Sequence, residues 1–308
     1  MIEVKNKPVR RLSRERGVRY PVQSEPKYKS RTKGRARIKK GLVYVLFAVP
    51  VVTQLYPLVW LLFYSLKTNE EIMDGSFFSL PKVWQWHNYK EAFESGSYLK
   101  YLSNSVLVTG ITMICVIVLS SMVAYAITRF RWRYGTAVMT IFLMGMMIPM
   151  QATLLPLMII FKHLHILNTH LSLILPYIAF STPISVFILS GFMKGIPHEI
   201  EESAFIDGAS VYRIFRSIIM PVSVPPMMTV CILTFISIWN EYILAATFIS
   251  SERLKTLPFG IYTFVSQYSV NYGDIGAFLI MGALPVILIY FFLSNQITKG
   301  MVAGAVKG

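Results

Sequence analysis

Long apolar segments separated by short polar ones form the main pattern of this chain from residue 42 onward. A helix needs about 20 largely apolar residues to cross the hydrocarbon core of a bilayer. Segments of that length lie at 42–66, 101–128, 135–161, 171–193, 222–249 and 275–297. The pattern therefore predicts an all-α, polytopic membrane protein with six transmembrane helices.

The composition agrees with a membrane protein. Of the 308 residues, 54% are hydrophobic and 15% are charged, whereas soluble domains average about 25% charged residues. The two cysteines, Cys115 and Cys231, lie inside apolar segments, which indicates neither a disulfide framework nor a metal site.

Proline and glycine interrupt several of the apolar segments. Each proline removes a backbone donor and kinks a helix. Ordinary packing explains most of them, because both residues are frequent in transmembrane helices. The crowded stretch of Gly145, Pro149 and Pro156 also suits a hinge or a cavity lining in a transporter.

A basic segment precedes the first apolar one. Residues 1–40 hold 15 Lys or Arg and three acids, within a chain of net charge +15. This segment suits a solvated extension beside anionic lipid. A nucleic-acid or regulatory arm is the alternative, and it is disfavoured because Tyr20 and Tyr28 are the only aromatic residues in this segment that could serve base stacking. We expect a basic cytoplasmic tail at 1–40 and a membrane domain at 41–308.

The distribution of Lys and Arg predicts the orientation. With the N-terminus inside, the inner segments hold 23 of these residues and the outer loops hold seven, as the positive-inside rule requires. Without the tail the ratio is 8 to 7, so the short turn at Arg129, Arg131 and Arg133 is the best independent support. Both termini are therefore expected in the cytoplasm.

Among the inner loops, the segment at 194–220 stands out because it predicts two short amphipathic helices around a turn. Pro197 suits a first helical turn, and Glu199, Glu201 and Glu202 suit the positive end of a helix dipole. Gly208 can adopt the left-handed conformation that ends a helix.

The apolar positions of this segment form two stripes. Ile200 and Ala204 are spaced as i and i+4, and Ser210 can cap a second helix whose stripe is Val211, Ile214 and Phe215. Apolar residues on such short helices need a surface to pack against. The acidic residues argue against anionic lipid, so the pattern favours a protein partner.

The same segment resembles the EAA loop of ABC importer permeases. That loop has the pattern Glu-Ala-Ala, then Gly, then Ile-x-Leu-Pro, and this chain has Glu202-Ser203-Ala204, Gly208 and Ile218-x-Met220-Pro221. Ser203 in place of alanine and Met220 in place of leucine are small departures in volume or shape.

Further strings resemble MalG-type permeases, the subunits of importers for sugars and oligosaccharides. They are LSNSVLVT, SSMVAYAITRFRWR, IPMQATLLPL, LNTHLSLILPY, WNEYILA and the terminal GMVAGAVKG. The strings stand in family order and together cover nearly all of 41–308.

This resemblance implies a type I ABC importer permease fold in a bacterial cytoplasmic (inner) membrane. It implies a second permease, two copies of an ATP-binding subunit, an external solute-binding protein and a sugar or oligosaccharide as partners, beside membrane lipid and without nucleic acid. It also implies that the EAA loop acts as a coupling helix that fits the ATPase. The residues expected to couple to the ATPase are Glu202, Ser203, Ala204, Asp207, Gly208, Ala209, Ile218 and Pro221.

Two further contacts are implied by the resemblance. The terminal residues Gly304, Lys307 and Gly308 correspond to a tail that enters the ATPase dimer interface, although a frayed end is the alternative. The stretch 251–275 corresponds to a loop that reaches into the binding protein. Its tip is expected at Leu257, Pro258, Phe259 and Gly260.

Glu241, next to Asn240 in the fifth segment, is the only acid within the six apolar segments. Ionisable groups inside a membrane are costly and usually face a cavity or a partner. Either Asn240 and Glu241 line the transport pathway, or Glu241 makes a structural hydrogen bond to a neighbouring helix or to the partner permease.

No catalytic residue is predicted. The chain has no GxxxxGK[ST] phosphate loop, so we expect it to bind no cofactor and a partner ATPase to bind ATP and Mg²⁺. An ion-coupled secondary transporter is the alternative function. It would need coupling groups at mid-membrane, for which Glu241 is the only candidate.

Overall fold

The computed structural model describes residues 32–76, 79–130, 132–266 and 269–305, and it describes side chains from Lys40 to Phe292 except at 42 and in those gaps. The basic tail expected at 1–40 therefore lies almost wholly outside the described residues, as do Lys307 and Gly308. Gly304 is described only as part of a helix.

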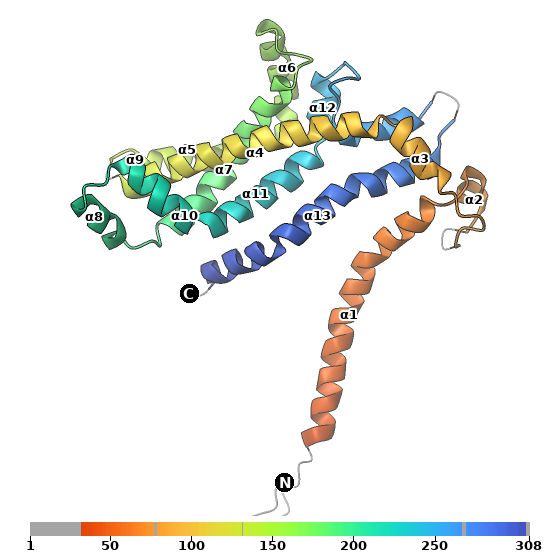
Figure 1. Cartoon of the computed structure of the whole chain (residues 1–308), viewed down its shortest axis with the longest axis horizontal. Helices are drawn as coiled ribbons and strands as arrows, with labels where there is room; N and C mark the ends of the chain where they lie inside the picture. The colour runs from red at the N-terminus through yellow and green to blue at the C-terminus, as the bar shows by residue number, and fades with distance from the viewer. Residues whose placement is uncertain (1–31, 77–78, 131, 267–268, 306–308) are drawn as a thin grey trace, which may run out of the picture. The chain divides into compact units, whose positions relative to one another are not determined.

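The described chain is helical almost throughout (Figure 1). Its only β-type pairing is an isolated bridge between Val265 and Val270. The α-helices are α1 Thr32–Tyr64, α2 Asn69–Asp74, α3 His87–Glu94, α4 Tyr98–Arg129, α5 Gly135–Gly145, α6 Leu154–His163, α7 Leu171–Met193, α8 Glu199–Ile206, α9 Val211–Ile214, α10 Met220–Val222, α11 Val224–Trp239, α12 Ile243–Phe248 and α13 Tyr272–Ala305. Two 3₁₀ segments, η1 Met150–Thr153 and η3 Leu257–Phe264, and one π-helical turn, η2 Phe215–Ile219, complete the order.

The chain divides into two compact units, residues 1–58 and 59–308. The described part of the first unit is a continuous helix, the first portion of α1, whose side chains from Val43 to Leu58 are exposed. The second unit contains every other element.

Four described helices are long and apolar enough to cross a membrane. These spans are Val43–Tyr64, Tyr98–Arg129, Leu171–Met193 and Tyr272–Phe292. Two bent helix pairs, 135–145 with 150–163 and 211–222 with 224–239, raise the number to six if each pair counts as one span. The prediction of an all-α polytopic membrane protein is confirmed.

The third apolar segment is not the continuous helix that its composition predicts. It bends by 89° between α5 and the pair formed by η1 and α6. Pro149 lies at the break with an extended backbone, φ −68° and ψ 128°. Proline lacks the N–H that would continue the helix, and it disfavours helical geometry at the preceding Ile148.

The fifth segment also departs from the prediction of one helix over 222–249. Helix α11 ends at Trp239, and α12 begins at Ile243. The Asn240 side chain donates to the Ile236 carbonyl at 2.8 Å, and Glu241 Oε1 accepts the Leu244 N–H at 2.9 Å. Side chains that bond nearby backbone groups in this way compete with helix continuation.

In the second unit, α4 packs along α7, and α11 packs on α4, α7 and α13 (Figure 1). Serine and threonine side chains are buried along α4 and α7, among them Thr112, Ser120, Ser121, Ser185 and Ser190. Such small residues let transmembrane helices approach closely. The short helices α8 and α9 lie at one end of this group, and α3 lies at the other (Figure 1).

A cluster of apolar side chains fixes the short helices to the long ones. Ala204 of α8 and Ile214 of α9 pack with Tyr125 of α4 and Leu189 and Met193 of α7. Ile214 is fully buried, and burying such a side chain stabilises by about 1.5–3 kcal/mol. The position of α8 and α9 is therefore set by packing against the ends of α4 and α7.

Candidate functional site

Helices α8 and α9, residues 199–214, form a pair of short helices that we call the helix pair. The turn between them has the hydrogen bonds of a Schellman motif: the Ala209 N–H donates to Ala204 O at 2.9 Å and the Gly208 N–H to Phe205 O at 3.0 Å. Gly208 has a φ of +80°, a left-handed conformation that glycine adopts without the strain it causes in most other residues. This confirms the left-handed helix end predicted at Gly208.

The start of each short helix also follows from its sequence. Ser210 caps α9, because its hydroxyl accepts the Arg213 N–H, as predicted. Glu199, Glu201 and Glu202 all lie in the first turn of α8, where negative charge is favoured by the helix dipole. The prediction that Pro197 opens this helix is wrong, because α8 begins after the cap residue His198.

The two faces of the helix pair differ in what they contact. Ala204 and Ile214 are buried against the long helices. On the other face Ile206 is 86% exposed, Tyr212 is 69% exposed and Phe205 is 49% exposed. Exposed apolar residues gathered on so short a segment indicate a surface for another molecule.

The EAA-loop residues are distributed over both faces. Glu202, Ser203, Asp207 and Gly208 are exposed, Ala209 and Ile218 are half-buried, and Ala204 is buried. Pro221 is exposed in α10, next to the π-helical turn η2. The predicted apolar stripes are only partly correct, because Ile200 and Val211 are each 40% exposed.

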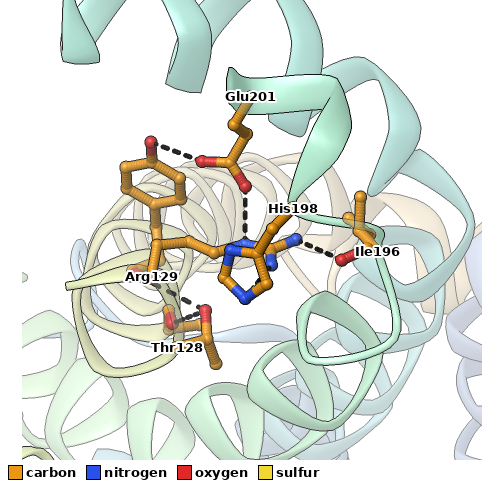
Figure 2. A network of polar contacts seen from close by, with 7 residues as sticks. Thr128, Arg129, Ile196, His198 and Glu201 are labelled. Atoms are coloured by element: carbon orange, nitrogen blue, oxygen red, sulfur yellow. Dashed lines mark hydrogen bonds and ion pairs between the residues drawn. The ribbon is translucent and has the colours of Figure 1, made fainter. Parts of the chain in front are cut away.

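A network of polar contacts joins the helix pair to the end of α4 (Figure 2). Arg129 Nε lies 2.7 Å from Glu201 Oε1, and these side chains are only 3% and 7% exposed. The Tyr125 hydroxyl donates to Glu201 Oε2 at 3.0 Å. Arg129 Nη2 donates to the Ile196 carbonyl at 2.9 Å, and Nη1 lies 3.2 Å from His198 Nε2. One guanidinium thus holds both the loop before α8 and its first turn.

The charges of this network suit the helices that carry them. Arg129 is the last residue of α4, and Glu201 lies in the first turn of α8. A cation at a helix C-terminus and an anion at a helix N-terminus are each stabilised by the helix dipole. Sequence reasoning missed this pairing, since it used Arg129 only for orientation and Glu201 only as a dipole charge.

Glu241 makes a second, half-buried connection between helices. Its Oε2 accepts a hydrogen bond from the Tyr177 hydroxyl of α7 at 2.6 Å, and its Oε1 accepts the Leu244 N–H at the start of α12. Glu241 and Tyr177 also line a pocket of ≈ 150 Å³ between α7 and α11. The remaining lining residues are Met150, Phe180, Ser181, Ile184, Leu233, Thr234, Ser237 and Ile238.

The hydrogen bond to Tyr177 agrees with the structural hypothesis for Glu241, and the pathway role stays a prediction. The carboxylate bonds a neighbouring helix, and it also faces the pocket. Asn240 is exposed and bonds its own helix, and it does not line this pocket. Among the described residues, no group of three or more His, Cys, Asp or Glu side chains is arranged to hold a metal ion.

The expected tip at Leu257–Gly260 requires correction. Leu257 is 3% exposed and Gly260 is buried, because η3 packs against α4 and α13. Pro258 and Phe259 are half-buried. The exposed residues among those described in 251–275 are Glu252, Arg253, Tyr262, Thr263, Val265, Ser266, Ser269 and Asn271.

Glu252 and Lys255 form an ion pair in the same stretch. The hydrogen bond from the Lys255 ammonium, followed by that from the Tyr101 hydroxyl, lowers the pKa of Glu252. The Lys255 ammonium also lies over the Phe259 ring, 3.6 Å from its centroid. These contacts fix the segment before η3 to α4.

Replacing Gly208 with alanine should loosen the turn of the helix pair. A left-handed backbone costs a non-glycine residue roughly 1–2 kcal/mol, so we expect amide exchange in residues 199–214 to accelerate by about tenfold. Hydrogen exchange with mass spectrometry measures this. Gly208→Asn is the matched control, because asparagine tolerates this conformation, and equal exchange in both variants would contradict the assignment of strain.

Comparison with known proteins relates this chain to membrane components of transport systems. A family model described as binding-protein-dependent transport system inner membrane component matches residues 116–298. The chain is 37% identical to a putative ABC transporter permease protein of Caldicellulosiruptor sp. (strain Rt8B.4). The alignment of 269 residues covers 87% of this chain and 98% of that protein.

Other relatives carry more specific names. A probable starch degradation products transport system permease protein of Thermoanaerobacterium thermosulfurigenes is 33% identical over 89% of this chain and 99% of its own length. A galactooligosaccharides transport system permease protein of Bacillus subtilis (strain 168) is 32% identical over 90% of this chain and 98% of its own length.

The fold has a counterpart among solved structures. A chain in the crystal structure of a bacterial ABC transporter that imports the acidic polysaccharide alginate matches with a TM-score of 0.74 at 20% identity, over 84% of this chain and 96% of that one. At that identity the match supports the fold alone. The family model and the relatives above agree with the broken spans and the helix pair. The chain is a member of the ABC transporter permease family, described as binding-protein-dependent transport system inner membrane components.

Proposed function

We propose that this chain is a permease subunit of an ATP-driven importer for sugars or oligosaccharides, and that the helix pair transmits movement from a separate ATPase. The observation that carries the proposal is the exposed apolar face of the helix pair, in a member of a family whose named relatives transport starch degradation products and galactooligosaccharides. The alternative of an ion-coupled secondary transporter provides no role for that face.

The proposed ATPase contact combines apolar and acidic groups. Ile206, Phe205 and Tyr212 supply exposed apolar area, and Glu202 and Asp207 supply exposed carboxylates beside it. Apolar anchors surrounded by polar groups are typical of protein interfaces. We propose that two ATP-binding subunits act in the complex, one on this helix pair and one on that of a second, related permease.

We propose that ATP hydrolysis by separate subunits supplies the energy for transport. The sequence contains no phosphate loop, so ATP and Mg²⁺ would bind to the ATPase subunits. Both termini would lie in the cytoplasm with the helix pair, where the residues Gly304, Lys307 and Gly308 would contact the ATPase. An external solute-binding protein would contact the opposite side, near the exposed residues Glu252, Arg253 and Tyr262.

We propose that the pocket at Glu241 lies on the solute pathway. It occurs where α11 breaks, and transporter sites often form at discontinuous helices. The lining combines hydroxyl groups of Tyr177, Ser181, Thr234 and Ser237 with the Glu241 carboxylate. These groups can exchange hydrogen bonds with the hydroxyl groups of a sugar.

Replacing Glu241 with glutamine should reduce uptake without loss of assembly. The glutamine oxygen can keep one of the two present hydrogen bonds, but the amide nitrogen cannot accept the other. Loss of one hydrogen bond to a charged group predicts roughly tenfold slower uptake, measured with radiolabelled sugar in cells. Glu71→Gln is the control, because Glu71 also accepts a backbone N–H, from Lys82, outside the pocket. Normal uptake by Glu241→Gln would contradict the pathway role.

The composition of the complex tests the proposed function. The chain would be purified from its native membrane in mild detergent, and the co-purifying proteins would be identified by mass spectrometry. A second EAA-bearing permease and a phosphate-loop ATPase in a fixed ratio are expected. A chain that emerges alone from several mild detergents would contradict the proposal and favour ion-coupled transport by this chain.

A further inference from the structure

We propose that Arg129, Glu201 and Tyr125 form a strut that makes the helix pair and α4 move as one body. These are positioning residues, which act on transport through the helix pair. The proposal deepens the proposed function and rests on it. A rigid link between the helix pair and α4 affects transport only if a separate ATPase moves the helix pair.

The first argument is the geometry of Arg129. Its planar guanidinium uses separate nitrogens for Glu201 of α8 and the Ile196 carbonyl in the loop before α8. The third nitrogen lies beside His198 (Figure 2). A rigid group that holds two points of one segment fixes its direction as well as its distance. A single apolar contact would fix neither.

The second argument is that Tyr125 joins α4 to both parts of the segment that follows α7. Its hydroxyl donates to Glu201 of α8, and its ring lies 5.1 Å from that of Phe215, which begins η2 after α9. One turn of α4 thus contacts the helix pair at its beginning and immediately beyond its end. A displacement of the helix pair without this turn would have to break both contacts.

The third argument comes from the physics of buried ion pairs. A buried pair is weak evidence for net stability, because desolvation offsets its attraction. Apolar packing of Ala204 and Ile214 already holds the helix pair in place. What the ion pair adds is a fixed direction of α8 relative to the C-terminal end of α4, where Arg129 is the last helical residue.

A double variant separates this role from a purely structural one. Glu201→Ala alone leaves the Arg129 charge buried without a partner and can prevent folding. In R129M/E201Q both charges are removed, the arginine is replaced by a chain of similar length, and the glutamine oxygen can still accept from Tyr125. This variant should therefore fold and assemble, while lacking the Arg129 contacts of the strut. Thr128→Val is the control, since Thr128 bonds only its own helix beside the network.

Spin labels test the mechanical claim directly. Met122 of α4 and Glu199 of α8 are exposed and would be changed to cysteine after replacement of Cys115 and Cys231 by serine. In the assembled complex we expect one narrow distance distribution for the parent and Thr128→Val, with and without ATP. We expect a broad or shifted one for R129M/E201Q. An unchanged narrow distribution in R129M/E201Q would overturn the proposal.

Coupling is tested in the same reconstituted complexes. Uptake is measured with whichever of trehalose, maltotriose and galactobiose the parent complex accumulates, and ATP hydrolysis is measured in parallel. For R129M/E201Q we expect sugar moved per ATP to fall by roughly tenfold, within the usual range of coupling free energies. An unchanged ratio would refute the strut alone, whereas absence of ATP-dependent uptake by the parent would refute the proposed function.

Discussion

Replacing Ile206 with glutamate should abolish ATP-driven uptake while the permease itself folds normally. Ile206 is 86% exposed, so the substitution removes no packing within the chain. Burial of an isoleucine side chain contributes about 1.5–3 kcal/mol, and a carboxylate buried in its place without a partner adds a further cost. Loss of about 3 kcal/mol corresponds to roughly 100-fold weaker binding of the ATPase.

The measurement is the amount of ATPase that co-purifies with the permease, together with uptake. Leu80→Glu provides the matched control, because Leu80 is also an exposed apolar residue, at 62%, outside the helix pair. This control should retain both the ATPase and uptake. If Ile206→Glu binds the ATPase as well as the unaltered chain does, the exposed face of the helix pair is not the contact.

Replacing Gly260 with alanine should markedly lower the stability of the protein. Gly260 lies in η3, at the end of the long helices away from the helix pair. A Cβ atom at this position would lie 2.1 Å from Cζ of Phe278 and under 3 Å from two further ring atoms. Phe278 is 2% exposed and packs in the core with Tyr98 and Phe264, so its ring has little room to move. Overpacking of this kind costs about 1–3 kcal/mol.

Thermal unfolding in detergent measures this effect. Gly110→Ala is the control, because a Cβ at Gly110 has no neighbouring atom within 4 Å, and alanine favours a helix interior over glycine by about 0.5–1 kcal/mol. We expect a lower midpoint for Gly260→Ala and an equal or higher one for Gly110→Ala. Equal midpoints for Gly260→Ala and the unaltered chain would show that the η3 segment does not pack on Phe278 as described.

The apolar pattern predicted the spans but not their breaks. Length and hydrophobicity decide whether a segment can lie in a membrane, and this holds for bent and straight helices alike. The break at Pro149 was signalled by the residue itself. The break at Glu241 was not, because the local bonds of Asn240 and Glu241 to backbone groups are joined by a hydrogen bond from Tyr177 of another helix, which no local pattern contains.

The helix pair shows the same limit at a smaller scale. Its turn was predictable because a glycine with φ +80° and a serine cap act within a few residues of themselves. The partner of Glu201 was not predictable, since Arg129 is distant in sequence and the two meet only when α4, α7 and α8 have packed. Burial at Leu257 and Gly260 escaped prediction for the same reason.

Energy dependence of uptake tests the central claim most directly. The complex purified from native membranes would be reconstituted in proteoliposomes with its co-purifying proteins, and accumulation of trehalose, maltotriose and galactobiose would be measured with ATP supplied to the ATPase side. We predict accumulation of at least one sugar that requires ATP hydrolysis and persists when proton and sodium gradients are dissipated. Accumulation that follows an ion gradient and ignores ATP would contradict the account.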